Sequence, residues 1–248
     1  MNRSNEKFRQ LERTMSRAWP SFEADDYDSW VLRYADGYTK RVNSVNPHFG
    51  SSLPLAEKIA HCESAYRERG LPTIFRLTPF SQPGNLDDTL EEFGYETLDP
   101  TLVMTCPLDG ALGDGVDLTL SASADQWFDA FDALRTLSTF EQVSHRRIIE
   151  SAEGERCFVV ITEDGVPRAC GVGICVDDAV GIFDLFVCES YRGKGLGSSI
   201  VRSVFGWAHK QRATMAFLQV HSLNAPARRL YERFGFTVAY RYWYCTKR

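Results

Sequence analysis

Three glycines alternate with other residues in Arg192-Gly193-Lys194-Gly195-Leu196-Gly197, between an apolar run typical of a strand and a run with helical spacing. A glycine-rich turn that opens a helix leaves backbone N–H groups unpaired at the positive end of the helix dipole. Glycine also removes side chains that would block an anion, and it permits positive φ angles. Arg192 and Lys194 add positive charge, so the segment predicts a cradle for a phosphate group.

Two common kinds of phosphate-binding loop are excluded by residues that they require. A P-loop needs the pattern GxxxxGK[ST], which does not occur in this chain. The dinucleotide pattern GxGxxG fails because Ser198 and Ile200 stand where its last glycine would be. The acidic residue that such a site uses at the end of the next strand is also missing, since that strand ends Gln219-Val220-His221.

The loop resembles the central motif of the GCN5-related N-acetyltransferases, which reads [Arg/Gln]-x-x-Gly-x-[Gly/Ala]. Arg192, Gly195 and Gly197 fill its three specified positions. Glu189 departs from the family, which usually has proline there. This departure affects the end of the strand rather than the expected phosphate contacts.

A second motif of the same family is matched downstream of the loop. Asn224, Ala227, Tyr231 and the pair Gly235-Phe236 have the spacing of that motif. The two motifs occur in the family's order, and the resemblance covers about residues 115–245. Either motif alone is moderately specific, whereas the two together are strongly indicative of the family.

The resemblance implies a site for acetyl-CoA. It implies that the pyrophosphate lies on the loop backbone, that the pantetheine arm pairs with the preceding strand like an added strand, and that Asn224 hydrogen-bonds this arm. The cofactor-binding residues expected on this basis are Leu185, Phe186, Val187, Arg192, Gly193, Lys194, Gly195, Leu196, Gly197, Ser198, Asn224, Ala227 and Tyr231.

The chemistry implied by the resemblance is direct attack of a neutral primary amine on a thioester. The Val187 N–H would bind the developing oxyanion, and Tyr231 would protonate the departing thiolate as a general acid. Because alkyl amines have pKa values of about 10.4, a base must remove one proton. Asp184 and Glu189 are candidates, and Asp184 is the expected catalytic partner of Tyr231. The alternatives are a strand carboxylate that faces solvent and a tyrosine that only packs on its helix.

A pattern of strand, capped helix, glycine and strand occurs twice, with Gly94-Tyr95 and Gly235-Phe236 lying 141 positions apart (235 − 94). The expected fold class is α/β (α+β), with two tandem acyl-CoA N-acyltransferase-like domains, each a mixed, mostly antiparallel sheet flanked by helices. The expected boundaries are 1–110 and 116–248, with a linker over 107–115. In the second domain we expect helices near 124–136, 141–151 and 196–211, and strands near 157–162, 168–176, 180–188 and 216–220.

The first domain is expected to keep the fold without the cofactor loop. Val45-Asn46-Pro47 matches the family's strand end, but residues 48–54 lack the glycine pair, and Leu90 stands where the 141-residue offset places Tyr231. We hypothesise that Trp30, Arg33 and Asn43 form part of the acceptor pocket; the alternative is that they bridge the two halves. Arg146-Arg147, beside His145, is expected to be a solvated helix face, or else to meet an acidic substrate.

The composition bounds the remaining possibilities. The 248 residues are 44% hydrophobic and 25% charged, with a net charge of −5, which argues against a nucleic-acid partner. No apolar run predicts a signal peptide or a membrane span. Seven cysteines without a CxxC pair predict free thiols, no metal site and a cytoplasmic protein.

The expected acceptor is a small-molecule amine, and the expected oligomeric state is a monomer or homodimer. Alternatives are acetylation of a protein N-terminus or lysine, and a CoA-sensing module without turnover.

Overall fold

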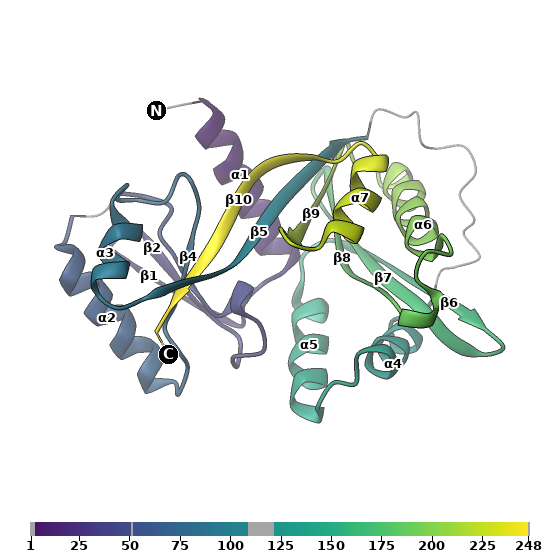
Figure 1. Cartoon of the computed structure of the whole chain (residues 1–248), viewed down its shortest axis with the longest axis horizontal. Coiled ribbons are helices and arrows are strands. Elements are labelled where there is room, and N and C mark those ends of the chain that lie inside the picture. Colours follow the sequence, from purple (N-terminus) through teal and green to yellow (C-terminus); the bar gives the residue numbers. More distant parts are fainter. Residues whose placement is uncertain (1–2, 51, 109–121, 248) are drawn as a thin grey trace. The chain divides into compact units, whose positions relative to one another are not determined.

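The computed structural model describes residues 3–50, 52–108 and 122–247, and the chain forms two compact units. Unit 1 comprises Met1–Val103, His221–Leu223 and Ala239–Arg248, and unit 2 comprises Met104–Val220 and Asn224–Val238. Most of the expected linker, residues 109–115, lies outside the described residues. Figure 1 labels the elements of both units along the chain.

In unit 1 the strands are hydrogen-bonded in the order β1-β2-β3-β4-β10-β5, with β5 and β10 also contributing residues to unit 2. The elements are α1 (Arg3–Ala18), β1 (Glu23–Tyr27), β2 (Trp30–Tyr34), the 3₁₀ helix η1 (Lys40–Val42), β3 (Val45–Asn46), α2 (Leu55–Glu68), β4 (Ile74–Leu77), α3 (Leu86–Glu92), β5 (Glu96–Pro107) and β10 (Thr237–Thr246).

In unit 2 the strand order is β5-β9-β8-β7-β6. The elements are α4 (Ala124–Arg135), α5 (Thr139–Ser151), β6 (Glu155–Glu163), β7 (Val166–Val176), β8 (Ala179–Val187), the 3₁₀ helix η3 (Glu189–Tyr191), α6 (Leu196–Lys210), β9 (Met215–His221) and α7 (Ala225–Arg233). The helices and strands expected here are all present, with ends shifted by at most two residues.

The two units share one topology. In unit 1, β1, β2 and β3 pair antiparallel, and β3 then pairs parallel with β4 across the helix α2. In unit 2, β6, β7 and β8 pair antiparallel, and β8 pairs parallel with β9 across α6. The helices α2 and α6 begin 141 positions apart (196 − 55), the same offset as the glycines. The predicted fold class, two tandem domains with mixed sheets and flanking helices, is confirmed.

Strands predicted as separate segments are continuous. The runs 95–98 and 101–105 both lie in β5, and the runs 236–240 and 242–244 both lie in β10. Residues 243–246 of β10 pair antiparallel with residues 74–77 of β4. This pairing explains why the C-terminal segment belongs to unit 1, whereas the sequence had suggested a second domain that runs to residue 248.

Two helices of unit 1 were not predicted, and one predicted cap is absent. The helix α1 has an apolar stripe of Phe8, Leu11, Met15 and Ala18 at helical spacing, and Leu11, Met15 and Ala18 are buried. The helix α2 buries Ile59, Cys62 and Tyr66 at the same spacing. The side chain of Asn85, expected to cap α3, makes no capping hydrogen bond.

Helices cover both faces of the strands in unit 2. A Cβ on Gly171 or Gly173 of β7 would lie 2.6 or 2.7 Å from Ile200 or Val204 of α6, so these glycines allow close packing of the helix. Trp127 of α4 packs on Phe158 of β6, which lies opposite Val172 and therefore on the other face of the sheet. Figure 1 shows α6 on one side of β6 to β8 and α4 with α5 on the other.

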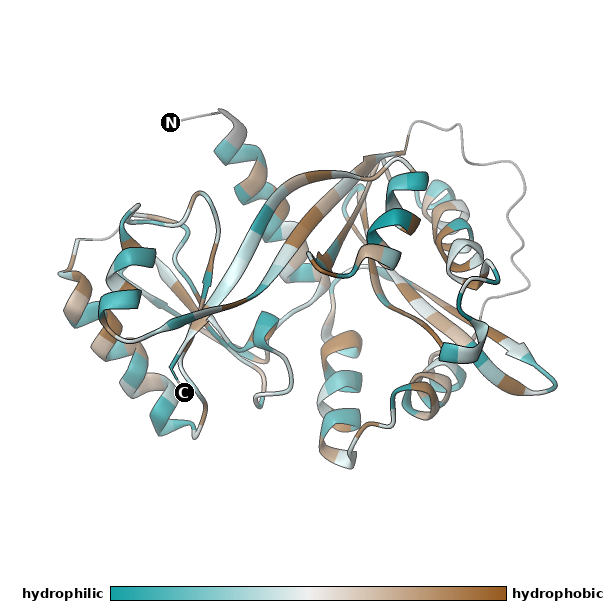
Figure 2. Ribbon diagram, viewed as in Figure 1, coloured by the Kyte–Doolittle hydropathy of each residue, from teal (hydrophilic) through white to brown (hydrophobic). Residues whose placement is uncertain are grey.

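The distribution of polar residues follows this packing. Figure 2 shows hydrophobic colour along much of β7 and β8 and a largely hydrophilic α7. All seven cysteines are free thiols, as predicted; six are buried, and Cys188 is half-buried. No helix within the described ranges is both long and apolar enough to span a membrane.

Candidate active site

The strands β8 and β9 separate within unit 2. Their parallel pairing ends at Ile182 and Leu218, although β8 continues to Val187. The register of β8 with β7 shifts at the same place, since Cys170 lies opposite Phe186 and Val172 lies opposite Phe183. β8 therefore carries one extra residue, a bulge that bends the strand. In the described residues, no strand pairs with the β9-facing edge of β8 beyond Ile182.

The end of β8 combines this free edge with apolar side chains. Leu185, Phe186 and Val187 are only half-buried. An unpaired strand edge offers N–H and C=O groups to an extended ligand, and adjacent apolar side chains can contact the apolar parts of that ligand. The geometry therefore suits a flexible chain that contains amides.

The glycine loop opens α6 as the sequence predicts. Gly193 and Gly195 have φ angles of +78° and +87°. Gly195 is the N-cap residue of α6, and its position provides no side-chain capping hydrogen bond. A Cβ on either glycine would meet no atom within 4 Å. No amide N–H from Gly193 to Ser198 donates a hydrogen bond to another described residue. The loop thus presents free donors at a helix N-terminus, which is an arrangement that binds anions.

Gly197 has a different role in the loop. A Cβ there would lie 3.0 Å from Leu230 Cδ2 of α7, 3.6 Å from Leu185 Cδ2 and 3.9 Å from Val187 Cγ2 of β8. The missing side chain therefore lets the start of α6, the end of β8 and α7 come close together. The structure in this way brings the cofactor-binding residues predicted on the three elements to one place.

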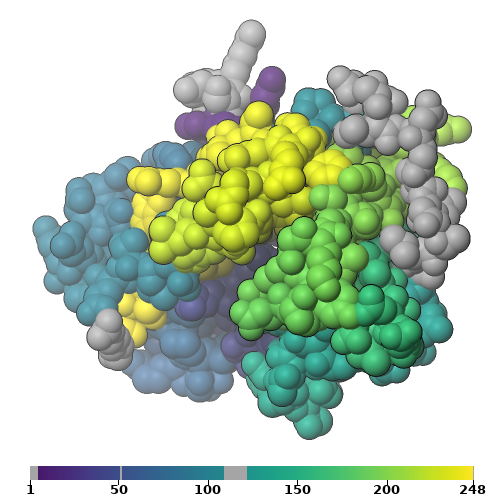
Figure 3. All heavy atoms as spheres, turned by 45° about the vertical axis from the view of Figure 1, so that its right-hand side comes forward, coloured from purple at the N-terminus to yellow at the C-terminus, as the bar shows by residue number. Residues whose placement is uncertain are grey.

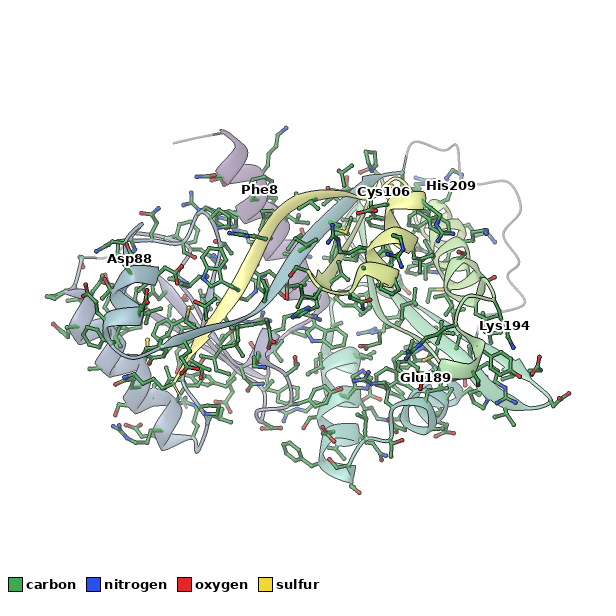
Figure 4. All side chains as sticks on the ribbon, in the orientation of Figure 1. Phe8, Asp88, Cys106, Glu189, Lys194 and His209 are labelled. Carbon is green, nitrogen blue, oxygen red and sulfur yellow. The ribbon has the colours of Figure 1, made fainter. Side chains whose placement is uncertain are left out.

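Two exposed cations flank the loop. The Lys194 ammonium lies 4.0 Å from the centre of the Tyr191 ring, and Arg192 Nη1 lies 3.7 Å from Glu189 Oε1. Figure 4 shows Glu189 and Lys194 near the end of β8 and the start of α6. The green atoms of this part of the chain lie at the surface in Figure 3. Both cations can approach a phosphate on the loop because weak surface pairs hold them only loosely.

The helix α7 supplies Asn224, Ala227 and Tyr231. Asn224 Oδ1 accepts a hydrogen bond from the Ala227 N–H at 3.2 Å, while Asn224 Nδ2 donates none within the described chain. Tyr231 is 8% exposed, its ring packs edge-on against Phe236, and its hydroxyl makes no hydrogen bond to a described residue. Burial raises the pKa of Tyr231 to about 12. The hydroxyl therefore stays protonated at neutral pH and is available as a donor.

Asp184 lies at the bulge of β8 and has an unpredicted partner. Its φ angle is +50°, and its Oδ2 lies 2.8 Å from Nε2 of His145 on α5. His145 is fully buried against Trp127 and Phe131. Of the two arginines expected on a solvated helix face, Arg147 is exposed, whereas Arg146 is half-buried and pairs with Asp125. The helical stripe Ser144, His145, Ile148 and Ile149, buried in the structure, was the available signal.

The residues predicted for the acceptor pocket lie in unit 1, where each has partners. The fully buried Trp30 donates its Nε1–H to the Gln82 carbonyl. The Arg33 guanidinium donates to three backbone carbonyls, and its burial lowers its pKa to about 10. The Asn43 side chain bonds the backbone of Ala35 in both directions. These contacts give all three side chains a structural role.

In unit 1, the segment just before α2 corresponds to the glycine loop of unit 2, and its amides bind a carboxylate of the same chain. The Asp28 carboxylate accepts hydrogen bonds from the N–H groups of Ser52 and Leu53, just before α2 begins. The buried Lys58 ammonium lies 3.2 Å from Asp28 Oδ2 and 3.9 Å from the Trp30 ring centre. The amide hydrogen bond from Leu53, with those from Ser52, holds the pKa of Asp28 well below its usual range.

Replacing Asp28 by alanine is expected to lower the melting temperature, because the amides and the buried Lys58 ammonium lose their anion. Asp28→Asn should have a smaller effect, since it keeps an acceptor oxygen. The contribution of the carboxylate is present above the unfolded pKa of about 3.9 and is lost as the pH falls below it. Thermal unfolding at pH 7 measures the effect, with the exposed neighbour Asp26→Ala as the control. Equal melting temperatures for Asp28→Ala and Asp26→Ala would contradict this role.

The chain is similar to several acetyltransferases. Residues 6–245 match the family described as "Probable histone acetyltransferase Rv0428c C-terminal". The chain is 29% identical over 246 residues to "Uncharacterized N-acetyltransferase YobR" of Bacillus subtilis, covering 97% of this chain and 98% of that protein. It is 33% identical over 93 residues to "Streptothricin acetyltransferase" of Streptomyces lavendulae, covering 35% of this chain and 49% of that protein.

A solved structure has the same fold. It is the GCN5-related N-acetyltransferase from Kribbella flavida, which superposes with a TM-score of 0.71 at 16% identity. The alignment covers 100% of this chain and 96% of that one.

Proposed function

Because this chain belongs to the family described as "Probable histone acetyltransferase Rv0428c C-terminal", within the GCN5-related N-acetyltransferases, we propose that it transfers an acetyl group from acetyl-CoA to a small-molecule primary amine. The chain is an acetyltransferase. The observation that carries the proposal is the unpaired edge of β8 beside the free amides of the glycine loop.

Residues of unit 2 are proposed to bind the pantetheine arm and the pyrophosphate of coenzyme A. The edge of β8 from Leu185 to Val187 would pair with the amides of the pantetheine arm, and Asn224 Nδ2 would donate to the same arm. The N–H groups from Gly193 to Ser198, with Arg192 and Lys194, would bind the pyrophosphate. Leu196 and Ala227 would line the arm. Since Asp28 already occupies the matching amides of unit 1, one coenzyme A per chain is proposed.

The protein groups around the thioester have distinct proposed roles. The Val187 N–H would stabilise negative charge on the carbonyl oxygen, and Asp184 would remove a proton from the acceptor ammonium. Tyr231 would donate to the departing sulfur. Its pKa of about 12 exceeds that of an ordinary thiol, about 8.5, so full transfer to a free thiolate would be uphill by about 5 kcal/mol. Tyr231 therefore acts best as a donor while the C–S bond is breaking.

A small-molecule acceptor is supported by the similarity to a protein named streptothricin acetyltransferase. The family description, which names a histone, favours a protein amine as the second candidate. Trp30, Arg33 and Asn43 stay a prediction as acceptor residues, and their hydrogen bonds within unit 1 support a structural role inside that unit.

A thiol-release screen with acetyl-CoA tests the proposal. The panel comprises spermidine, streptothricin, neamine, a lysine-containing histone tail peptide and a peptide with a free N-terminal alanine, each corrected for the rate without enzyme. We expect the largest kcat/KM with one of the small molecules. Release with the peptides alone would assign a protein acceptor. Binding of acetyl-CoA without release by any amine would indicate a binding module and would contradict the proposal.

A further inference from the structure

We propose that His145 is a positioning residue for acetyl transfer: it holds the Asp184 carboxylate at the β8 bulge, so that the second carboxylate oxygen can take a proton from the acceptor ammonium. The inference rests on the proposed function and adds a residue from α5 to the site. It also gives a role to the one described histidine whose side chain is fully enclosed by unit 2.

The geometry of the pair is directional. His145 Nε2 lies 2.8 Å from Asp184 Oδ2, and with a proton on Nε2 the imidazole donates this hydrogen bond. Asp184 Oδ1 makes no hydrogen bond with any described residue, and the Asp184 side chain is 23% exposed. One oxygen is thus anchored from inside the protein, and the other remains open to a substrate.

The backbone of Asp184 turns at the bulge. Its φ angle of +50° lies in the left-handed region, which aspartate adopts more readily than most residues with a Cβ. Asp184 lies two residues beyond Ile182, where the pairing of β8 with β9 ends, and three residues before the Val187 N–H that is proposed to bind the oxyanion. The hydrogen bond from His145 therefore fixes both the bulge and the direction of the carboxylate.

The two sides of the sheet supply different parts of the site. His145 packs on Trp127, on the face covered by α4, whereas the glycine loop opens α6, which packs on the opposite face. The acceptor would therefore reach the Asp184 carboxylate from the side of α4 and α5. The cofactor would reach the amides of the glycine loop from the side of α6. An amine and a thioester would meet in the opening between β8 and β9.

Other charged groups of unit 2 face this pair. Asp132 and Arg135 on α4 and Arg146 on α5 act electrostatically on the pair or on its neighbours. Burial raises the pKa of Asp132, and the electrostatic effects of His145 and Arg146 act in the opposite direction. Burial, and then the Asp184 charge, raise the pKa of the Cys170 thiol on β7 to about 12, so this thiol stays protonated at neutral pH. Asp184 is the one carboxylate among them that lies at the bulge.

The protons balance with these groups in their roles. Asp184 takes one proton from the ammonium and later releases it to solvent. The free amine nitrogen forms the C–N bond as the C–S bond breaks, and Tyr231 gives its proton to the sulfur. The proton lost by the nitrogen when the amide forms restores the Tyr231 hydroxyl. The net change is one amide, one thiol and one proton released per acetyl group.

The test compares His145→Phe, which keeps an aromatic ring and removes the donor, with His145→Gln and with the control Ile148→Val. Ile148 is fully buried on the same helix and leaves the pair intact. Thiol release is measured from pH 6 to 9 with the best alkyl amine of the panel and with hydroxylamine, which is largely uncharged at neutral pH, after subtracting the rate without enzyme.

With the alkyl amine, His145→Phe is expected to lower kcat by about 10- to 100-fold, with a KM for acetyl-CoA within about twofold of wild type. His145→Gln should recover part of the rate, and hydroxylamine should be much less affected. Equal losses for both acceptors, or a loss equal to that of Ile148→Val, would overturn the inference. Absence of thiol release by wild type would instead overturn the proposed function together with it.

Discussion

Tyr231→Phe is expected to lower kcat by about 10²-fold while leaving the KM for acetyl-CoA nearly unchanged. The ring of Tyr231 packs against Phe236, and phenylalanine keeps this contact. Only the hydroxyl is lost, and it makes no hydrogen bond to a described residue whose loss would destabilise the fold. The effect should therefore fall on the step in which the sulfur departs.

The pH dependence of wild type provides a second check on this role. Because the pKa of Tyr231 is raised to about 12, its hydroxyl stays protonated well past neutrality, and kcat should not fall between pH 7 and 10 through its ionisation. Tyr191→Phe is the matched control, since that ring lies beside the loop and contacts Lys194. An unchanged kcat in Tyr231→Phe, or a loss of equal size in Tyr191→Phe, would refute the general-acid role.

The glycine loop and its elements could be predicted from sequence because local chemistry determines them. Gly193, Gly195 and Gly235 adopt the positive φ angles that only glycine takes readily. The turn at Asp164-Gly165, likewise with positive φ angles, joins β6 and β7 where expected. A duplicated pattern in the sequence corresponds to a duplicated topology in the structure.

The remaining features depend on contacts between distant segments. The pairing of His145 with Asp184 joins positions 39 residues apart, and nothing in either local pattern indicates it. The bulge of β8 appears only in its register with β7. The place of β10 beside β4 depends on the choice of a strand partner, which residue preferences do not specify. The Asp28 carboxylate binds amides just before α2 because the β1–β2 hairpin that carries it lies at the start of that helix.

The double replacement Gly193→Ala with Gly195→Ala is expected to weaken coenzyme A binding by about 100-fold, because the new methyl groups would occupy the space in front of the free amides. The loss of one or two charge-assisted hydrogen bonds, at about 1.5–3 kcal/mol each, accounts for an effect of this size. The positive φ angles add strain of about 1–2 kcal/mol per alanine, which lowers stability in both the free and bound states.

Gly165→Ala separates the strain from the binding effect. Gly165 has a φ angle of +75°, lies in the β6–β7 turn of the same unit, and has no atom within 4 Å of an added Cβ. Its replacement by alanine should therefore lower stability by a similar amount per site while leaving the affinity for coenzyme A unchanged.

Calorimetric titration of coenzyme A into wild type, Gly165→Ala and the double variant measures whether the loop of unit 2 binds the acyl donor. If the loop of unit 2 binds the acyl donor, one molecule of coenzyme A should bind per chain in wild type and in Gly165→Ala. In the double variant, the dissociation constant should rise about 100-fold. Two bound molecules per chain, or an unchanged affinity in the double variant, would contradict it.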